Sequence, residues 1–436
     1  MRFFYNFLSY LVAPLFVSAT LWRGFKNHAY WQRLHERFGF VPAFDRPVIW
    51  IHAVSVGEVH AAAPFVRSLI KDFPGYEVLI TTVTPTGAER VNKIFDGSVH
   101  HAYIPYDLPG SVKRFFKRVK PHLAMIIEKE LWPNLYHACG VRRIPLVLAS
   151  AQMSPHSVNK YKIFTPLFKE ALSHGILIAA QTEADAERFE SIGANPKRIH
   201  VVGNIKFDFA LADDIQQQGK SFRQRHWPQR VSWIAASTHE GEEALLINVW
   251  RAVREVVPQH LWILVPRHPE RFDKVKELLR SHGLNVVTRT SGRQVADDTD
   301  VFLLDTIGEL TQFYSAADVA FVAGSFEPIG GHNLLEPASL GLPVLTGPYN
   351  FNGEEIANQL IAAGGARKVV DQNALVAELI ELLGNTDERT SMGKRGLTVV
   401  ETNRGAVERL QKLIGPLIEH GSFDEKQPNS IYSPSH

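Results

Sequence analysis

Residues 319–348 read VAFVAGSFEPIGGHNLLEPASLGLPVLTGP, which joins a short apolar run to a glycine-rich loop and then to a helix start. The run at 319–323 is of the kind that a parallel sheet buries on both faces. Gly324, Gly330 and Gly331 let a backbone approach a ligand closely, because glycine has no Cβ. The stretch therefore predicts an α/β fold with a ligand loop after a buried strand.

The end of this stretch is typical of a nucleotide site. Asn333 is expected to cap the following helix, whose unpaired N–H groups and positive dipole end suit a phosphate. Glu336 lies where a carboxylate repels phosphate but accepts hydrogen bonds from a ribose diol. An ordinary capped helix, with Glu336 complementing the dipole, is the alternative.

Short apolar runs alternate with amphipathic segments along the rest of the chain, which is typical of repeated βαβ units. The expected strands are 48–53, 78–82, 101–104, 123–127, 146–149, 176–180 and 199–202, and then 233–237, 261–265, 285–288, 301–304, 319–323 and 344–345. We expect two doubly wound parallel sheets, with substrate held in a cleft beyond the carboxyl ends of their strands.

The length of 436 residues exceeds what one core usually organises, so two main domains are expected. The predicted organisation is an anchor at 1–22, an N-terminal α/β domain at 23–207, a linker at 208–230, a C-terminal α/β domain at 231–403, a terminal helix at 404–420 and a disordered tail at 421–436.

Composition excludes several classes of function. A net charge of +2 gives no argument for nucleic-acid binding by the whole protein. The single cysteine, Cys139, excludes an internal disulfide framework and a cysteine-based metal cluster, and it fits a reducing compartment. No histidine spacing suggests zinc, so we expect neither a metal nor another cofactor.

The N-terminus departs from this ordinary composition. Residues 3–22 contain no charged side chain, and about twenty apolar residues are long enough to cross a bilayer. Arg23, Lys26, Arg33 and Arg37 follow, as at an anionic membrane surface. A spanning helix and a helix lying in the interface both remain open. In either case the basic flank is expected to keep the domains in the cytoplasm.

Polar side chains follow three expected strands of the first half. Glu58 opens the helix after 48–53, Glu128 and Glu130 flank Lys129 after 123–127, and Lys206 lies at the domain junction. Each has an ordinary alternative: a glutamate that complements a helix dipole, a solvated charge run and a surface lysine.

The second half repeats this arrangement. Pro266 and Arg267 follow the strand at 261–265, and an arginine held between two prolines loses little freedom when it binds phosphate. Residues 305–310 follow the expected strand at 301–304 and open a helix.

Taken together, six strings make the chain resemble the 3-deoxy-D-manno-octulosonic acid (Kdo) transferases, which attach Kdo to the lipid A precursor. The strings are HAVSVGE at 52–58, TPTG at 84–87, ELWPN at 130–134, GNIKFD at 203–208, VPRHPER at 265–271, and GGHN with LEP within 330–337. The resemblance implies a GT-B fold, CMP-Kdo as donor, a lipid A precursor (lipid IVA) as acceptor bound by the N-terminal domain, no metal, and a place on the cytoplasmic side of the inner membrane.

The resemblance also implies roles for single residues. Glu58 becomes the general base, ionised at neutral pH, in an inverting transfer, and Glu128 and Lys206 stabilise the transition state. The CMP contacts fall on Pro266, Arg267, Ile307, Gly308, Glu309, Asn333, Leu334, Leu335 and Glu336.

Two other functions remain open from the residues alone. A sugar-nucleotide epimerase shares the two-domain architecture but needs no anchor. A membrane-anchored lipid-binding protein needs the apolar and basic N-terminus but not Glu336 or Arg267.

Overall fold

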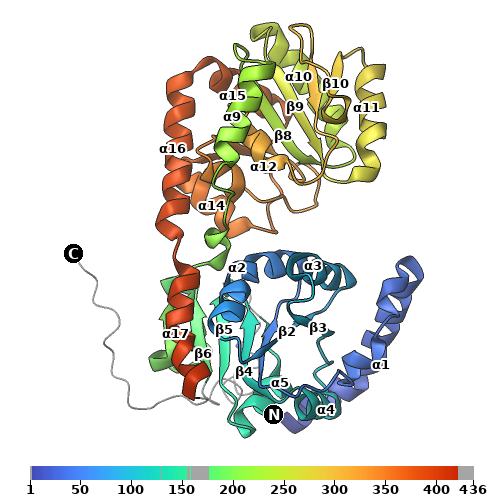
Figure 1. Ribbon diagram of the computed structural model, residues 1–436, viewed down its shortest axis with the longest axis vertical. Helices are drawn as coiled ribbons and strands as arrows, with labels where there is room; N and C mark the ends of the chain where they lie inside the picture. Colours follow the sequence, from blue (N-terminus) through green and yellow to red (C-terminus); the bar gives the residue numbers. More distant parts are fainter. Residues whose placement is uncertain (1, 129, 155–157, 159–175, 421–436) are drawn as a thin grey trace, which may run out of the picture. The chain divides into compact units, whose positions relative to one another are not determined.

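The computed structural model describes residues 2–128, 130–154, 158 and 176–420, so Lys129 and the tail at 421–436 lie outside it. The chain divides into two compact units (Figure 1). Unit 1 comprises residues 1–210 together with 404–436, and unit 2 comprises residues 211–403. Each unit carries its own parallel sheet, as the sequence predicts.

The sheet of unit 1 has the strand order β3-β2-β1-β4-β5-β6-β7, and all pairs are parallel. All five residues of β1 are buried, which is why its sequence reads as a continuous apolar run. The strands are β1 (Val48–His52), β2 (Glu77–Thr82), β3 (His100–Tyr103), β4 (Pro121–Ile127), β5 (Leu146–Ala151), β6 (Leu177–Ala180) and β7 (Ile199–Val201).

Helices cover both faces of this sheet. One apolar core joins the strands to α4, α5 and α8, and a second joins them to α2, α3 and α17. The helices are α1 (Arg2–Lys26), α2 (Val56–Asp72), α3 (Pro85–Phe95), α4 (Pro109–Val119), α5 (Pro133–Val141), α8 (Glu183–Ser191) and α17 (Ala406–His420), with short 3-10 turns at η1 (His28–Tyr30), η2 (Leu34–Phe38), η3 (Pro196–Arg198) and η4 (Ile205–Asp208).

The sheet of unit 2 has the parallel strand order β10-β11-β9-β8-β12-β13-β14. Its strands are β8 (Ser232–Thr238), β9 (Leu261–Pro266), β10 (Val286–Thr288), β11 (Val301–Leu303), β12 (Val319–Val322), β13 (Val344–Thr346) and β14 (Ala366–Lys368). The last of them is absent from the sequence prediction, since its side chains are only partly buried and include Arg367 and Lys368.

The helices of unit 2 are also divided between two apolar cores. One core contains side chains of α10, α11 and α15, and the other contains side chains of α9 and α12. The elements are α9 (Ile215–His226), α10 (Glu242–Val256), α11 (Phe272–Ser281), α12 (Leu310–Tyr314), α13 (Leu335–Ser339), α14 (Glu354–Ala362), α15 (Gln372–Gly384) and α16 (Thr386–Asn403), with 3-10 turns at η5 (Pro269–Arg271) and η6 (Arg289–Ser291).

Two segments differ from the expected organisation. The stretch 208–230, expected as a linker, contains helix α9, and Phe222 and Trp227 are buried in a core of unit 2. These two aromatic residues stand in a glutamine-rich segment, so the sequence did not predict a helix packed against the core. The terminal helix α17 returns to unit 1, where Leu410 and Ile414 are fully buried. The Asp208 carboxylate holds its start by accepting hydrogen bonds from the N–H groups of Gly405 and Val407, each at 2.6 Å.

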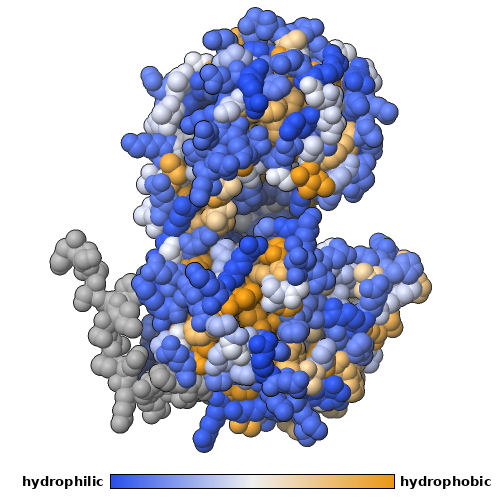
Figure 2. All heavy atoms as spheres, viewed as in Figure 1, coloured by the Kyte–Doolittle hydropathy of each residue, from blue (hydrophilic) through white to orange (hydrophobic). Residues whose placement is uncertain are grey.

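Helix α1 is apolar and long enough to span a membrane, yet polar bonds hold it along unit 1. The Tyr5 hydroxyl donates to Asp107 Oδ2 at 2.8 Å, and Thr20 Oγ1 lies 3.0 Å from the Tyr106 hydroxyl. Most of the exposed side chains of the helix are apolar, and Figure 2 shows hydrophobic spheres among hydrophilic ones in this part of unit 1. Those at least 60% exposed are Phe3, Phe4, Phe7, Leu11, Leu15, Phe16, Trp22 and Phe25.

Two of the four basic residues expected at the membrane surface are used inside unit 1. Arg37 is 4% exposed, and its guanidinium donates to the Val83 carbonyl at 2.7 Å. Arg33 donates to Glu36 at 2.8 Å and to the His101 carbonyl at 2.5 Å. The expectation that Arg37 lies at the membrane surface is therefore wrong, because its guanidinium is buried and satisfies a carbonyl of the fold. The Arg33 side chain remains 37% exposed.

Candidate active site

Both sheets reverse their strand order beside the first strand of the unit. In unit 1, β2 and β3 lie on one side of β1, and β4 to β7 lie on the other. In unit 2, β9 pairs with one edge of β8 and β12 pairs with the opposite edge. Doubly wound proteins bind ligands at the carboxyl ends of strands at such a reversal. The loops after β1, β4, β8 and β12 are therefore the candidate positions.

Glu58 lies in the first turn of α2, directly after β1, and makes a variant of the capping box in which its carboxyl accepts from the residue before the N-cap Ser55. Its Oε2 accepts from the Val54 N–H at 2.6 Å and its Oε1 accepts from Ser55 Oγ at 3.3 Å. Ser55 Oγ in turn accepts from the Glu58 N–H at 3.4 Å. Helix capping, which the sequence left open for this residue, is thus a real role of the carboxyl.

The surroundings of Glu58 do more than cap a helix. The pKa of Glu58 is raised from 4.5 to about 8, chiefly by burial and also by the carboxylates of Glu128 and Glu130, while the Val54 N–H and Lys206 oppose this rise. The carboxyl is therefore mostly protonated at pH 7. This corrects the expectation of an ionised side chain, because a first-turn glutamate looks exposed until the loop after β4 is placed beside it.

Glu128 and Lys206 meet although 78 residues separate them in the sequence. Lys206 Nζ lies 2.5 Å from Glu128 Oε1, and the two side chains are 27% and 13% exposed. Glu128 has a φ of 64°, a left-handed conformation that is strained for a residue with a Cβ. Strain of this kind at the end of a buried strand indicates that the orientation of the carboxylate is held by its surroundings.

Asp107 stabilises the start of α5 in unit 1. The sequence analysis did not name this residue. Its two carboxylate oxygens accept from the N–H groups of Asn134 and Leu135 at 3.0 and 2.9 Å, at the start of α5. The same carboxylate accepts from Tyr5 of α1. Burial raises the pKa of Asp107 to about 6. Its position just after an expected strand was the available signal.

In unit 2 the Glu336 carboxyl lies beneath the expected nucleotide loop. Asn333 Nδ2 donates to Glu336 Oε1 at 3.0 Å. Burial raises the pKa of Glu336, while Asn333, Arg267 and Thr311 oppose the rise. The structure thus brings together residues that follow β9, β11 and β12, as the sequence predicts for Arg267, Asn333 and Glu336.

The helix after the glycine-rich loop differs from the expected one. Asn333 Oδ1 does accept from the Leu335 N–H at 3.0 Å, but the N-cap position is Leu334. Helix α13 has only five residues, so its dipole is weaker than expected. Leu334 and Leu335 are buried and shape the loop from below.

The remaining expected contacts lie at the carboxyl ends of β9 and β11. Pro266 ends β9, and the Arg267 N–H donates to the Thr238 carbonyl at 3.0 Å. Ile307 is 70% exposed, and Gly308 has a φ of 92° that favours glycine. The Glu309 carboxylate is engaged by Arg289 at 2.9 Å and by Thr306 at 2.5 Å, and its backbone carbonyl accepts from the Phe313 N–H at 3.2 Å.

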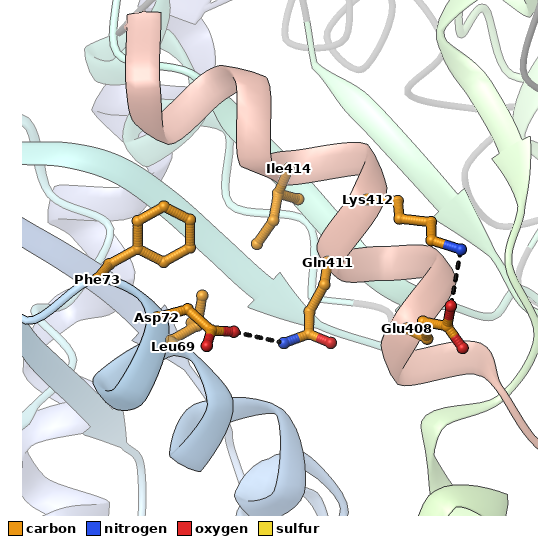
Figure 3. Close-up of a pocket in the computed structure, with 7 residues that line it drawn as sticks. All are labelled: Leu69, Asp72, Phe73, Glu408, Gln411, Lys412 and Ile414. Carbon is orange, nitrogen blue, oxygen red and sulfur yellow. Dashed lines mark hydrogen bonds and ion pairs between the residues drawn. The ribbon is translucent and has the colours of Figure 1, made fainter.

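The cavity drawn in Figure 3 is separate from these residues. It measures about 280 Å³ and lies between the last turn of α2 and α17, lined by Leu69, Asp72, Phe73, Glu408, Gln411, Lys412 and Ile414. Leu69 is 11 residues beyond Glu58 on α2, which corresponds to about 16 Å along a helix axis. Within the described ranges, no group of three or more histidine, cysteine or acidic residues is placed to hold a metal ion.

Comparison with known proteins decides between the functions left open. Over 422 residues the chain is 40% identical to the 3-deoxy-D-manno-octulosonic acid transferase of Haemophilus influenzae, across 96% of this chain and 99% of the relative. The chain belongs to the Kdo transferase family. It is therefore a glycosyltransferase, and the resemblance seen in the six sequence strings is confirmed.

Other matches agree with this assignment. Residues 32–209 match the family 3-deoxy-D-manno-octulosonic-acid transferase, and residues 245–398 match glycosyl transferases group 1. The Kdo transferase of Bordetella pertussis is 36% identical over 83% of this chain and 85% of its own length. The UDP-GlcNAc 2-epimerase of Neisseria meningitidis matches the fold alone, with a TM-score of 0.54 at 16% identity, over 84% of this chain and all of that chain. The fold by itself would thus not separate a transferase from an epimerase.

Proposed function

We propose that this Kdo transferase moves Kdo from CMP-Kdo to a lipid A precursor, lipid IVA, with inversion at the anomeric carbon, in lipopolysaccharide synthesis. Membership of the family supports the transferred sugar and the donor. The observation that carries the mechanism is the cluster of Glu58, Glu128 and Lys206 at the strand reversal of unit 1.

Glu58 acts as the general base on the acceptor hydroxyl. A base must lose its own proton before it can take another, and its pKa of about 8 brings the ionised form within reach near neutral pH. A carboxylate with this raised pKa is also a stronger base toward a sugar hydroxyl than an ordinary glutamate. The proton moves to Glu58 as the acceptor oxygen attacks, which is single displacement with inversion.

The leaving group requires positive charge. As the bond between the anomeric carbon and the phosphate oxygen breaks, CMP leaves with the electron pair and the sugar carbon becomes positively charged. Arg267 supplies positive charge for the phosphate, and the Lys206–Glu128 pair stabilises the transition state. We propose that these side chains meet the charge requirement without a metal ion.

Different residues suit the phosphate, the ribose and the cytosine of CMP. Arg267 suits the phosphate and Glu336 suits the ribose hydroxyls, since a partly buried carboxyl held by Asn333 is a preoriented acceptor. The backbone of Pro266 and the turn at Ile307, Gly308 and Glu309 offer polar groups for the cytosine. The loop from Asn333 to Leu335 supplies the remaining proposed contacts with CMP.

Helix α1 places the enzyme on the cytoplasmic face of the inner membrane by lying in the lipid interface. Its bonds through Tyr5 and Thr20 hold one side to unit 1, and the opposite side is apolar and exposed. A spanning helix would have to break these bonds.

We expect the full chain to float with anionic vesicles and a chain starting at Arg23 to stay mostly in solution. Replacing Phe7 and Leu11, which are 62% and 64% exposed, by serine should have nearly the same effect. If α1 spanned the bilayer, the two serines would leave flotation unchanged, because other apolar residues would still hold the helix in the membrane.

A transfer assay tests the proposed reaction. Purified protein, CMP-Kdo and lipid IVA should give a product heavier by one or more Kdo residues in mass spectrometry, together with free CMP. The same incubation without lipid IVA is the control. CMP released without any change in the mass of the lipid would contradict the assignment of the acceptor.

A further inference from the structure

Two histidines of unit 2, absent from the expected site, form a pair at the reversal of strand order. His239 follows β8 and His332 lies in the loop after β12. Their Nε2 atoms are 2.9 Å apart. The ring planes are within 6° of parallel and the centroids are 5.1 Å apart, so the rings meet edge to edge along this contact.

The surrounding backbone is built to hold this pair. The fully buried carboxylate of Glu242 accepts from the His239 N–H at 3.0 Å and from the Gly324 N–H at 2.8 Å, which fixes the two loops to each other. The Gly331 N–H donates to the Gly324 carbonyl at 2.8 Å and sets the start of the segment that carries His332.

Gly324 makes room for the pair. A Cβ at this position would lie 2.7 Å from His332 Cδ2 and 3.4 Å from His239 Cδ2, and the φ of 68° also favours glycine. The glycine that opens the loop is therefore needed by the imidazoles as well as by the turn.

The contact between the two Nε2 atoms determines which Nδ1 atoms of the pair can donate a hydrogen bond to a ligand. Two neutral imidazoles share one N–H between their Nε2 atoms, which leaves one Nδ1 as a donor and the other as an acceptor. When the pair gains one proton, both Nδ1 atoms become donors and the pair carries one positive charge. Among the described residues, no protein atom is hydrogen-bonded to either Nδ1.

The charges around the pair keep it neutral in the free protein. The pKa of His332 is lowered to about 4, chiefly by burial and also by Arg267, His239 and His268. Burial also lowers the pKa of His239, with His268, Arg267 and Arg271 acting in the same direction and Glu243 opposing them. An anion bound to the pair would favour the protonated form instead, because its negative charge stabilises the positive charge of the pair.

We infer that His239 and His332 bind the carboxylate of the transferred acid sugar and take up one proton from solvent when they do. The inference rests on the proposed function. In CMP-Kdo the carboxylate and the phosphate oxygen are bonded to the same carbon atom. A phosphate held by Arg267 therefore brings the carboxylate close to the imidazoles. The Nε2–Nε2 contact places the two Nδ1 atoms on opposite edges of the pair, so the protonated pair offers the carboxylate its positive charge and one charge-assisted hydrogen bond, from the Nδ1–H of the nearer ring.

Steady-state kinetics of His332→Gln and His239→Gln test this assignment. We expect the KM for CMP-Kdo to rise about tenfold or more, as for a lost hydrogen bond between charged groups. The dissociation constant of CMP, which has no carboxylate, should stay within about threefold. In the wild-type enzyme the KM should increase with pH above neutrality, because proton uptake becomes costly, and both variants should lose this slope.

His282→Gln is the matched control, since His282 is exposed at the end of α11 and is not among the groups that shift the pKa of His239 or His332; it should leave the KM and its slope unchanged. Glu336→Ala is the positive control for the titration and should weaken CMP binding about 5- to 150-fold. A CMP affinity that falls in parallel with the KM, or a slope that survives in both variants, overturns the inference. Absent wild-type transfer would instead contradict the proposed function.

Discussion

Glu58→Gln is expected to lower turnover about 10²- to 10⁴-fold, the usual contribution of a general base. Glutamine keeps the shape of the side chain and can still accept the Val54 N–H, so the start of α2 should persist. It cannot accept a proton from the acceptor hydroxyl. The measurement is kcat with CMP-Kdo and lipid IVA, beside the dissociation constant of CMP, which should not change.

Glu183→Gln is a matched control for this substitution. Glu183 is an exposed glutamate in the first turn of α8, in the same unit. It can complement the helix dipole but does not belong to the Glu58 cluster. Near wild-type turnover in Glu183→Gln, together with a large loss in Glu58→Gln, assigns the effect to proton transfer. Turnover of Glu58→Gln within a few-fold of wild type would remove Glu58 from the mechanism.

The pH dependence of the same variant separates a base from a capping residue. Because the pKa of Glu58 is raised from 4.5 to about 8, wild-type kcat should increase with pH up to about 8 and then level off. The stability that the protonated carboxyl confers is fully present below pH 4.5 and is lost as pH rises through 8, at about 1.4 kcal/mol per pH unit at most.

Glutamine does not titrate, so the melting temperature of Glu58→Gln should match wild type near pH 4.5 and exceed it increasingly up to pH 8. An ionised capping carboxylate predicts the opposite order at neutral pH, since losing its interaction with the dipole costs about 0.3–1 kcal/mol. Melting curves of both proteins at pH 5 and pH 8.5 distinguish the two roles.

Lys206→Met is expected to lower kcat about 10²- to 10³-fold, as when one preorganised electrostatic group is removed from an active site. Methionine keeps most of the apolar length but leaves Glu128 without the ammonium group that lies 2.5 Å away. Since Lys206 lowers the pKa of Glu58, its loss should also move the rising limb of the kcat profile to higher pH.

Lys197→Met is the control for this second substitution. Lys197 is exposed and lies just before β7, whereas Lys206 lies beyond the other end of that strand. It should show wild-type kcat and an unshifted profile. If kcat of Lys206→Met recovers fully at high pH, Lys206 acts only by tuning Glu58. If neither kcat nor the profile changes, the lysine is a surface residue of no catalytic importance.

Much of the fold followed from the sequence because its signals are local. Buried parallel strands read as continuous apolar runs, so 13 of the 14 strands within the described residues lie at runs predicted from the sequence. The exception among them is β14, which carries two basic side chains. The same locality placed Glu58, Arg267 and Asn333 at the carboxyl ends of strands. Helix α9 was missed because two aromatic side chains, Phe222 and Trp227, pack a segment that otherwise looks like a linker.

Properties that depend on residues distant in the sequence came only from the tertiary structure. The order of the strands brings Glu128 and Lys206 together beside Glu58, and this meeting, with burial, raises the pKa that a lone first-turn glutamate would not show. The same holds for Arg37, which looked like a lipid contact but bonds the Val83 carbonyl, and for the pairing of His239 with His332. Residue types and spacing determine secondary structure because their physics acts over a few residues, whereas ionisation and orientation depend on neighbours that only the folded chain brings close.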